Sequence, residues 1–303
     1  MDAAQPGIFA QGTRAHHHLE LTLRPDARDD DIGPALRRLR EPSVTVGGAN
    51  IVIGFGPACW RRLAPASTPG ELRDFETIEG SAGSLAPATQ HDLWLWIHGA
   101  GTDVVLDTAR AVERCLRPVA ELALEQPGFV YRDSRDLTGF IDGTENPPVE
   151  EGPEVALVAD GPGARGSFAM TMRWVHNLEA FDGLAVADQE DVFGRTKDLS
   201  VELSDDRKPS TAHIARVVIE EEGEELEIYR RSVPFGRVGE LGLFFVAFSA
   251  EPHRFDVMLA RMFGTTGDGL HDRLTEFSRP TSGSFWFVPS LSALAEVMGG
   301  PRD

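Results

Sequence analysis

Cysteine and lysine are both scarce in this chain. Its 303 residues include two cysteines, Cys59 and Cys115, far apart and without a CxxC spacing, and two lysines, Lys197 and Lys208. The cysteine pattern argues against a disulfide framework and a structural zinc site. No stretch approaches the roughly 18 apolar residues of a membrane helix. Residues 1–23 also lack the basic and apolar regions of a signal peptide, so we expect a cytoplasmic protein.

Acidic residues outnumber basic residues in this chain, 48 to 29. The formal net charge is −19, with a pI near 4.8. Such a surface repels phosphate groups, which argues against binding to nucleic acid or to an anionic membrane. The acidic runs are typical of solvated loops, and a second interpretation is that they steer cationic or neutral substrates. The hydrophobic fraction of 41% is that of an ordinary globular protein.

Hydrophobic periodicity predicts an order of strand, helix, strand, strand, helix, strand in the first part of the chain. The second helix shows one apolar face from Val105 to Ala123, with Pro118 inside the pattern as a kink or break. This order is typical of a ferredoxin-like fold. The elements are expected at residues 18–23, 31–40, 51–55, 93–98, 105–123 and 129–131.

A polar stretch over residues 132–139 predicts a domain boundary, and the same order follows it. We therefore expect an α+β protein of two tandem ferredoxin-like domains with antiparallel sheets, residues 1–135 and 136–303, of the dimeric α+β barrel type. The expected strands lie at 168–174, 214–219, 226–230, 243–248 and 285–288, with short helices in 179–194 and a longer one at 255–263. A hairpin turn containing Gly223 joins the second and third of these strands.

The most unusual segment is GFIDGTENP, residues 139–147. From composition alone it is a tight turn, because Asp-Gly and Asn-Pro are common turn dipeptides. The histidines are equally ambiguous on their own. His16, His17 and His18 look like a metal-binding tract, but alternation along a strand lets only His16 and His18 converge. A lone histidine such as His213 is usually structural.

Several segments together resemble the dye-decolorizing peroxidase family. GFIDGTENP matches the family signature in full, and the similarity extends from Gly7 to Pro289, most strongly after Asp136. The compact chain is most similar to the B-type branch. The other matching segments are residues 167–176, 193–197, 212–216, 229–236, 242–248 and 283–289.

The resemblance implies one haem b per chain, with His213 as the axial ligand of the iron. A ligating histidine normally donates its second N–H to a carboxylate or carbonyl group. Asp272 lies where the family carries such a carboxylate, and Asp268 is the alternative. For the haem edge and the propionates, the resemblance points to Thr144, Glu145, Arg195 and Lys197.

On the open face of the haem, the resemblance assigns Asp142 as the acid–base group and Arg230 as the cation that assists O–O cleavage. The adjacent Arg231 should face the other side of its strand. Ser232 stands where many relatives carry asparagine, and its hydroxyl can orient a water but offers no pair of N–H donors. Because an aspartate is a weak base, we expect the best turnover at roughly pH 4 to 6.

The function implied is reduction of hydrogen peroxide with oxidation of dyes, phenols or other small organic reductants. One alternative hypothesis is a haem-handling protein for storage, iron release or porphyrin oxidation. Another is a scaffold or interaction protein without haem. The family also implies a homo-oligomer. Cargo of a protein shell is not favoured, since the chain ends at residues 299–303, soon after the last expected helix.

Overall fold

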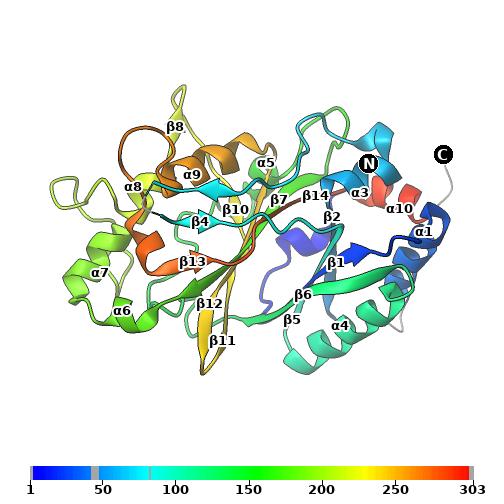
Figure 1. Ribbon diagram of the computed structural model, residues 1–303, viewed down its shortest axis with the longest axis horizontal. Helices are drawn as coiled ribbons and strands as arrows, with labels where there is room; N and C mark the ends of the chain where they lie inside the picture. Colours follow the sequence, from blue (N-terminus) through cyan, green and yellow to red (C-terminus); the bar gives the residue numbers. More distant parts are fainter. Residues whose placement is uncertain (1–2, 42–47, 82, 300–303) are drawn as a thin grey trace.

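The computed structural model describes residues 3–41, 48–81 and 83–299. The first two residues of the N-terminal stretch and the tail from residue 300 lie outside these ranges. Two βαββαβ repeats follow one another along the chain, as the sequence predicts. They form opposite halves of the molecule, and the last helix, α10 (Leu291–Val297), lies at the side of the first repeat (Figure 1).

The first repeat places its two helices on one face of a four-stranded antiparallel sheet. The sheet has the order β2-β5-β1-β6. Short additional elements, α3 (Pro57–Leu63), β3 (Ile78–Glu79) and β4 (Leu85–Ala86), lie in the long connection before β5. The repeat consists of β1 (Ala15–Leu23), α1 (Asp29–Arg37), β2 (Asn50–Phe55), β5 (Leu93–Gly99), α4 (Thr102–Leu116) and β6 (Ala120–Phe129).

The second repeat has the equivalent order, β10-β12-β7-β14, with β11 also paired to β12 and β13 to β7. Its strands are β7 (Ser167–His176), β10 (Tyr229–Arg230), β11 (Val233–Arg237), β12 (Glu240–Ser249), β13 (Ser278–Pro280) and β14 (Ser284–Val288). Its helices are α6 (Leu178–Asp182), α7 (Val186–Phe193), α8 (His213–Val217) and α9 (His253–Phe263). Outside the two repeats lie α5 (Gly152–Ala156), the hairpin of β8 (Glu220–Glu221) with β9 (Glu224–Glu225), and α10 (Leu291–Val297).

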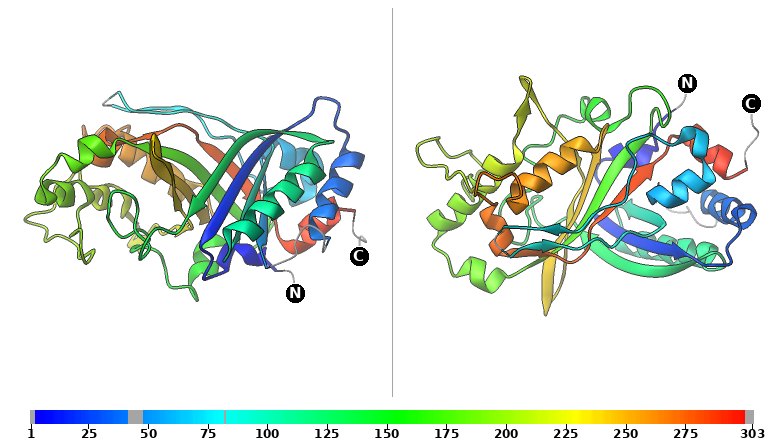
Figure 2. Two further views of the ribbon diagram at one scale, coloured as in Figure 1. Left: turned by 90° about the horizontal axis from the view of Figure 1, so that it is seen from below. Right: turned by 45° about the horizontal axis from the view of Figure 1, so that its top comes forward.

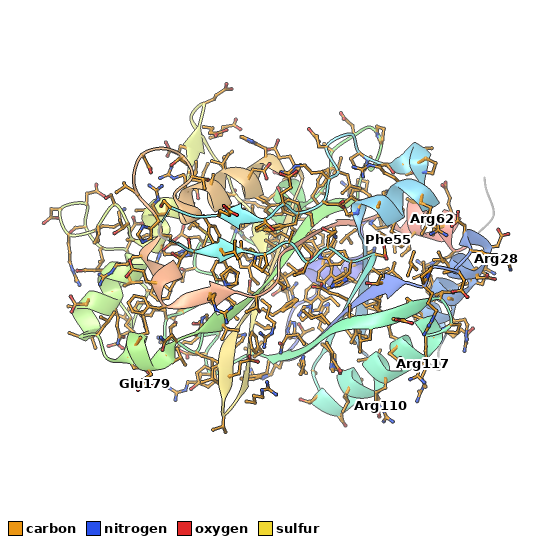
Figure 3. All side chains as sticks on the ribbon, in the orientation of Figure 1. Arg28, Phe55, Arg62, Arg110, Arg117 and Glu179 are labelled. Carbon is orange, nitrogen blue, oxygen red and sulfur yellow. The ribbon has the colours of Figure 1, made fainter. Side chains whose placement is uncertain are left out.

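The two sheets join into one. Strand β14 of the second repeat pairs with β2 of the first through the single pair Phe287 and Phe55, and Figure 2 shows the strands running continuously from one half to the other. Phe55 is fully buried at this join, whereas Arg110 on α4 and Arg117 directly after it point outward (Figure 3). The inner faces of both sheets share one apolar cluster, which includes Trp94 and Trp286.

The break expected at Pro118 is confirmed, since helix α4 ends at Leu116 and the apolar pattern beyond it belongs to β6. Other expectations for the secondary structure are wrong. The strand expected at 129–131 is β6, which begins at Ala120 and ends at Phe129. Residues 214–219 do not form a strand, since His213–Val217 is the helix α8. A short apolar run fits either structure by periodicity alone.

Among the described residues, no helix combines the length and the apolar character needed to cross a membrane.

Candidate active site

The main cavity lies in the second half of the molecule, between one face of the β7–β12 pair and the helices α8 and α9. Its floor is apolar, so a hydrophobic group can lie against it without leaving polar atoms unpaired. The side chains forming this floor are Met170, Met172, Trp174, Ile228, Leu243, Phe245, Met258, Leu259 and Met262.

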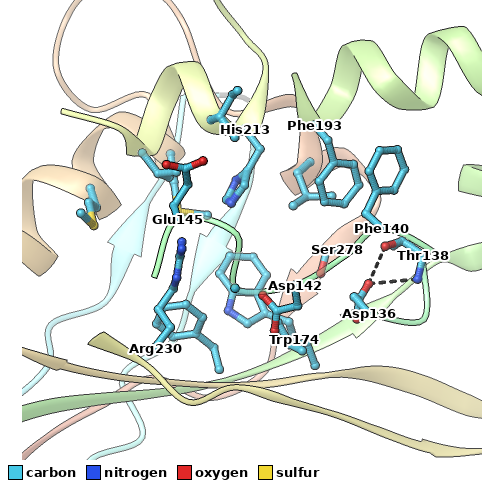
Figure 4. A pocket seen from close by; sticks show the side chains of 18 of the residues that line it. Asp136, Thr138, Phe140, Asp142, Glu145, Trp174, Phe193, His213, Arg230 and Ser278 are labelled. Atoms are coloured by element: carbon cyan, nitrogen blue, oxygen red, sulfur yellow. Dashed lines mark hydrogen bonds between the residues drawn. The ribbon is translucent and has the colours of Figure 1, made fainter. Parts of the chain in front are cut away.

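His213 reaches into this cavity from the first turn of α8 (Figure 4). Its Nδ1 donates to Oδ2 of Asp272 over 2.6 Å. Asp272 is fully buried, and its second oxygen accepts the backbone N–H of Leu274 at 2.9 Å. This arrangement fixes the tautomer, so Nε2 of His213 keeps its lone pair on the cavity side.

The rival carboxylate, Asp268, does not contact His213. It pairs with Arg216 at 2.9 Å, and Arg216 also donates to the carbonyl of Arg261 on α9. The expectation of Asp272 as the partner of His213 therefore agrees with the geometry. Arg216 holds the short helix α8 against α9, which fixes the position of the histidine.

The GFIDGTENP segment places Asp142 opposite His213 (Figure 4). Gly139 and Gly143 have φ of +90° and +79°, which side chains other than glycine seldom adopt. The backbone N–H of Asp142 donates to the carbonyl of Ser134 at 2.9 Å. Arg135 supports the turn by donating to the carbonyls of Gly139 and of Lys197.

Arg230 enters the cavity from β10, on the same side as Asp142 (Figure 4). Its backbone is held by the side-chain amide of Asn146, which accepts from its N–H at 2.7 Å and donates to its carbonyl at 3.1 Å. The Nε atom of Arg230 is buried without a partner among the described residues. Arg231 faces away, as predicted, and its guanidinium lies 5.1 Å from the ring centre of Trp96.

Burial raises the pKa of Asp142 above its ordinary value, although the positive charge of Arg230 acts to lower it. The carboxyl therefore keeps a proton at higher pH than a surface aspartate does. A raised pKa makes it a stronger base once ionised, which suits a group that accepts and returns a proton.

The residues expected at the haem edge are only partly brought together. Thr144, Glu145 and Arg195 line the cavity, and Arg195 forms an ion pair with Glu145. Lys197 does not line it, because its Nζ donates to the side-chain oxygen of Gln189 at 2.6 Å.

Ser232 also lies away from the main cavity. Its hydroxyl accepts the backbone N–H of Val246 on β12 at 3.2 Å, and its side chain borders a different hollow. The expectation that Ser232 works beside Asp142 over the haem is therefore not supported by its position. Strand β10 ends at Arg230 and β11 begins at Val233, so the alternation that would put Ser232 on the face of Arg230 is interrupted between them.

One polar group in the cavity was not predicted. His176 donates from Nε2 to Asp136 at 3.2 Å, and its Nδ1 lies 2.8 Å from the hydroxyl of Ser278. Burial alone would raise the pKa of Asp136, but His176 and the two hydrogen bonds from Thr138 lower it below its usual range. Asp136 is thus a fixed negative charge near Asp142. No sequence spacing indicates this group, because pairing of β13 with β7 assembles it.

The histidines of β1 do not form a metal site. His16 and His18 do point to the same side, with ring centres 6.4 Å apart. Within the described ranges, however, no cluster of three or more metal-ligating side chains exists. Both rings are buried among the aromatic side chains between the sheets, including Trp94 and Trp96.

Comparison with protein families assigns both halves of the chain. Residues 5–130 match the family described as Dyp-type peroxidase, N-terminal, and residues 133–293 match Dyp-type peroxidase, C-terminal. The chain belongs to the Dyp-type peroxidase family. Among curated relatives, the dye-decolorizing peroxidase of Rhodococcus erythropolis is 36% identical over 263 residues, which are 85% of this chain and 77% of that protein. The enzyme of Mycobacterium tuberculosis is 34% identical, over 81% of this chain and 74% of the relative.

Solved structures of Dyp-type peroxidases share the whole architecture. A Dyp-type peroxidase protein from Shewanella oneidensis superimposes with a TM-score of 0.92 at 32% identity, covering 100% of both chains. DyPB from Rhodococcus jostii superimposes with a TM-score of 0.86 at 33% identity, over 93% of this chain and 94% of that chain. A variant of the latter protein was solved in complex with heme. The tandem ferredoxin-like fold and the family predicted from the sequence are thereby confirmed.

Proposed function

We propose that this peroxidase binds one haem b in the main cavity, reduces hydrogen peroxide there and oxidises small organic reductants. Residues 136–303 would carry the haem, and residues 1–135 would form the companion domain. Bound haem supplies the redox chemistry, and the protein supplies binding, orientation and proton transfer. His213 would hold the iron, with Asp272 keeping its ring in the ligating tautomer.

The donor set of the cavity fits such a group. A free imidazole nitrogen of His213 faces an apolar floor, and on the opposite side Arg230 presents a buried Nε without a partner among the residues described. Arg195 at the rim has a buried, unpartnered Nε as well. Guanidinium groups suit the carboxylates of a porphyrin, because they form paired hydrogen bonds.

The residues opposite His213 would manage the peroxide. Asp142 takes the proton from one peroxide oxygen and returns it to the other, which then leaves as water. Arg230 stabilises the negative charge that develops as the O–O bond breaks, and it stays protonated even though burial lowers its pKa. Ser232 has no direct part in this step, because its hydroxyl is bonded to β12.

The placement of Asp142 and Arg230 opposite His213 in one cavity is the observation that supports this proposal (Figure 4). The test is the absorption spectrum of haem-loaded protein before and within a second of adding one equivalent of hydrogen peroxide. The Soret band should lose intensity at once in the parent protein. It should respond much more slowly in Asp142→Ala and Arg230→Ala.

Asp107→Ala and Arg110→Ala are matched controls, since these exposed residues lie on α4, outside the cavity. They should respond like the parent. If the Soret band of the parent does not change on addition of peroxide, the proposal is contradicted and the haem-handling hypothesis remains. Absence of a Soret band after loading would remove His213 as a ligand.

We further propose that the protein is a cytoplasmic homo-oligomer that is not enclosed in a shell. The low cysteine content supports a reducing compartment. Light scattering on the purified protein measures the assembly, and a monomeric mass at micromolar concentration would contradict this part.

A further inference from the structure

The carboxyl group of Asp142 is carried by a short hairpin that also contains Asp136. The backbone N–H of Asp142 donates to the carbonyl of Ser134 at 2.9 Å. Nearer the turn, the N–H of Asp136 donates to the carbonyl of Phe140 at 2.9 Å, and its carbonyl accepts the N–H of Gly139 at 2.9 Å. Asp136 is therefore tied to the same backbone segment that positions Asp142.

The side chain of Asp136 is buried and fully hydrogen-bonded. Its Oδ2 accepts the backbone N–H of Thr138 at 3.0 Å and the Thr138 hydroxyl at 2.6 Å (Figure 4). Its Oδ1 accepts Nε2–H of His176 at 3.2 Å, and Nδ1 of His176 lies 2.8 Å from the hydroxyl oxygen of Ser278. Hydrogen bonds of this kind favour the ionised form of a carboxyl group. Asp136 therefore keeps a negative charge although it is buried.

Several other charges at the cavity already have partners. Glu145 forms an ion pair with Arg195, and His213 donates to the buried carboxylate of Asp272. These pairs compensate one another locally. Among the residues described, the charged or titratable side chains that line the cavity beside Asp142 are Asp136, Glu145, His176, Arg195, His213 and Arg230.

The remaining charges act on Asp142 in opposite directions. Burial raises the pKa of Asp142 most strongly, the positive charge of Arg230 lowers it, and the negative charge of Asp136 raises it further. Two carboxylates that share one buried region resist being ionised together. Because Asp136 is held in its ionised form, Asp142 is the member of the pair that takes up a proton.

We propose that Asp136 is a positioning residue for the peroxide step: its hairpin fixes the carboxyl of Asp142, and its negative charge keeps a proton on Asp142 to a higher pH than burial alone would. The inference rests on the proposed peroxidase function and adds a residue that does not itself touch the peroxide. Asp142 takes a proton from one peroxide oxygen and holds it until it is returned to the other. A fixed negative charge nearby makes Asp142 a stronger base for this transfer.

Asp136→Asn removes the charge and can keep the hydrogen bonds. The amide oxygen can accept from Thr138, and the amide nitrogen can donate to His176, whose ring then takes its other tautomer and donates to Ser278. In the haem-loaded protein, the rate with hydrogen peroxide falls at low pH as Asp142 is protonated. In Asp136→Asn this fall should begin about one pH unit lower than in the parent, measured by stopped-flow absorption.

The proton on Asp142 can also be followed without peroxide. Infrared difference titration of the haem-loaded protein detects the C=O stretch of a protonated carboxyl group, and the band that is missing in Asp142→Asn belongs to Asp142. The midpoint of this band should fall by about one pH unit in Asp136→Asn. Asp136→Ser is also neutral but smaller, and its midpoint should move in the same direction.

Two variants separate charge from packing. Asp182→Asn removes the same charge from an exposed position on α6, outside the cavity, and should titrate as the parent does. Ser278→Ala alters the same buried group without changing its charge, so the midpoint should stay in place. An unchanged midpoint in Asp136→Asn would overturn the proposal, and so would an equal shift in Ser278→Ala, because Asp136 would then act through packing alone. The infrared midpoint is read without turnover, so it is independent of whether the parent reacts with peroxide.

Discussion

Nδ1 of His213 lies 2.6 Å from Oδ2 of Asp272, a carboxylate with no exposed surface. A hydrogen bond to a buried carboxylate makes an imidazole more electron-rich and raises its strength as a ligand. The second oxygen of Asp272 is bonded to the backbone N–H of Leu274, so the carboxylate cannot rotate away.

We expect Asp272→Asn to bind haem but to react with hydrogen peroxide about 10 to 100 times more slowly. The reduction potential of the haem should rise, because a less basic imidazole stabilises the oxidised iron less well. Stopped-flow absorption and spectroelectrochemistry measure the two effects. Asp256→Asn is the matched control, since Asp256 pairs with Arg73 and does not line the main cavity. Equal effects in both variants would contradict the role of Asp272.

Replacing Asp142 by asparagine should slow the reaction with hydrogen peroxide by about 10² to 10⁴. In the parent, this rate should fall as the pH drops through the pKa of Asp142, because protonation removes the base. Burial raises that pKa above the ordinary value of 3.8, so the fall should begin at a higher pH than for a surface aspartate.

Stopped-flow rates between pH 3 and 8 should show this fall in rate at low pH in the parent, and the fall should be absent in Asp142→Asn. For turnover of reductants, we still expect the optimum at roughly pH 4 to 6. An optimum above pH 8 would be incompatible with Asp142 as the base.

Ser232→Ala should leave the rate with hydrogen peroxide within about twofold of the parent, a barrier change of less than about 0.5 kcal/mol. The reason is that the hydroxyl bonds to the backbone of Val246 and does not line the main cavity. The free energy of unfolding should fall by about 1 kcal/mol, measured by urea titration. A large loss of peroxide reactivity with normal stability would show that Ser232 acts on the peroxide.

The interior between the two sheets should make the protein sensitive to acid. Burial lowers the pKa of His16 to about 4 and of His98 to about 2, from 6.5, and that of His18 falls as well. Between pH 6.5 and 4 the unfolded chain therefore binds more protons, and stability falls as the pH drops. Burial raises the pKa of Glu20 from 4.5 to about 8. Between these two pH values the folded chain binds more protons at this carboxyl than the unfolded chain, so Glu20 opposes the effect of the histidines, but it is one group against three.

His18→Leu should flatten this dependence by nearly one proton, or about 1.4 kcal/mol per pH unit. Urea unfolding at pH 5, 5.5 and 6 measures the slope. His253→Gln is the control, because the side chain of His253 is 54% exposed. An unchanged slope in His18→Leu would mean that His18 is already protonated in the folded protein.

Patterns within short stretches of the sequence predicted most of the fold and the central residues of the site. Alternation and apolar runs located most strands, and matching blocks selected His213, Asp142 and Arg230. The polar group of Asp136, His176 and Ser278 could not be predicted, because 102 residues separate His176 from Ser278 and only the pairing of β13 with β7 joins them. The position of Ser232 could not be predicted either, because Ser232 lies in the break between β10 and β11, which the apolar pattern does not reveal.

A single backbone pair, Phe55 with Phe287, joins the two sheets, yet side chains from both repeats share one interior. Segments near the two ends of the chain also contact each other, since the side-chain amide of Gln5 donates to the carbonyls of both Ile53 and Pro289. If the chain were cut between residues 135 and 136, each fragment would expose tryptophans that the other normally covers. The two pieces should therefore be poorly soluble when made separately and should recombine when made together, as in fragment complementation.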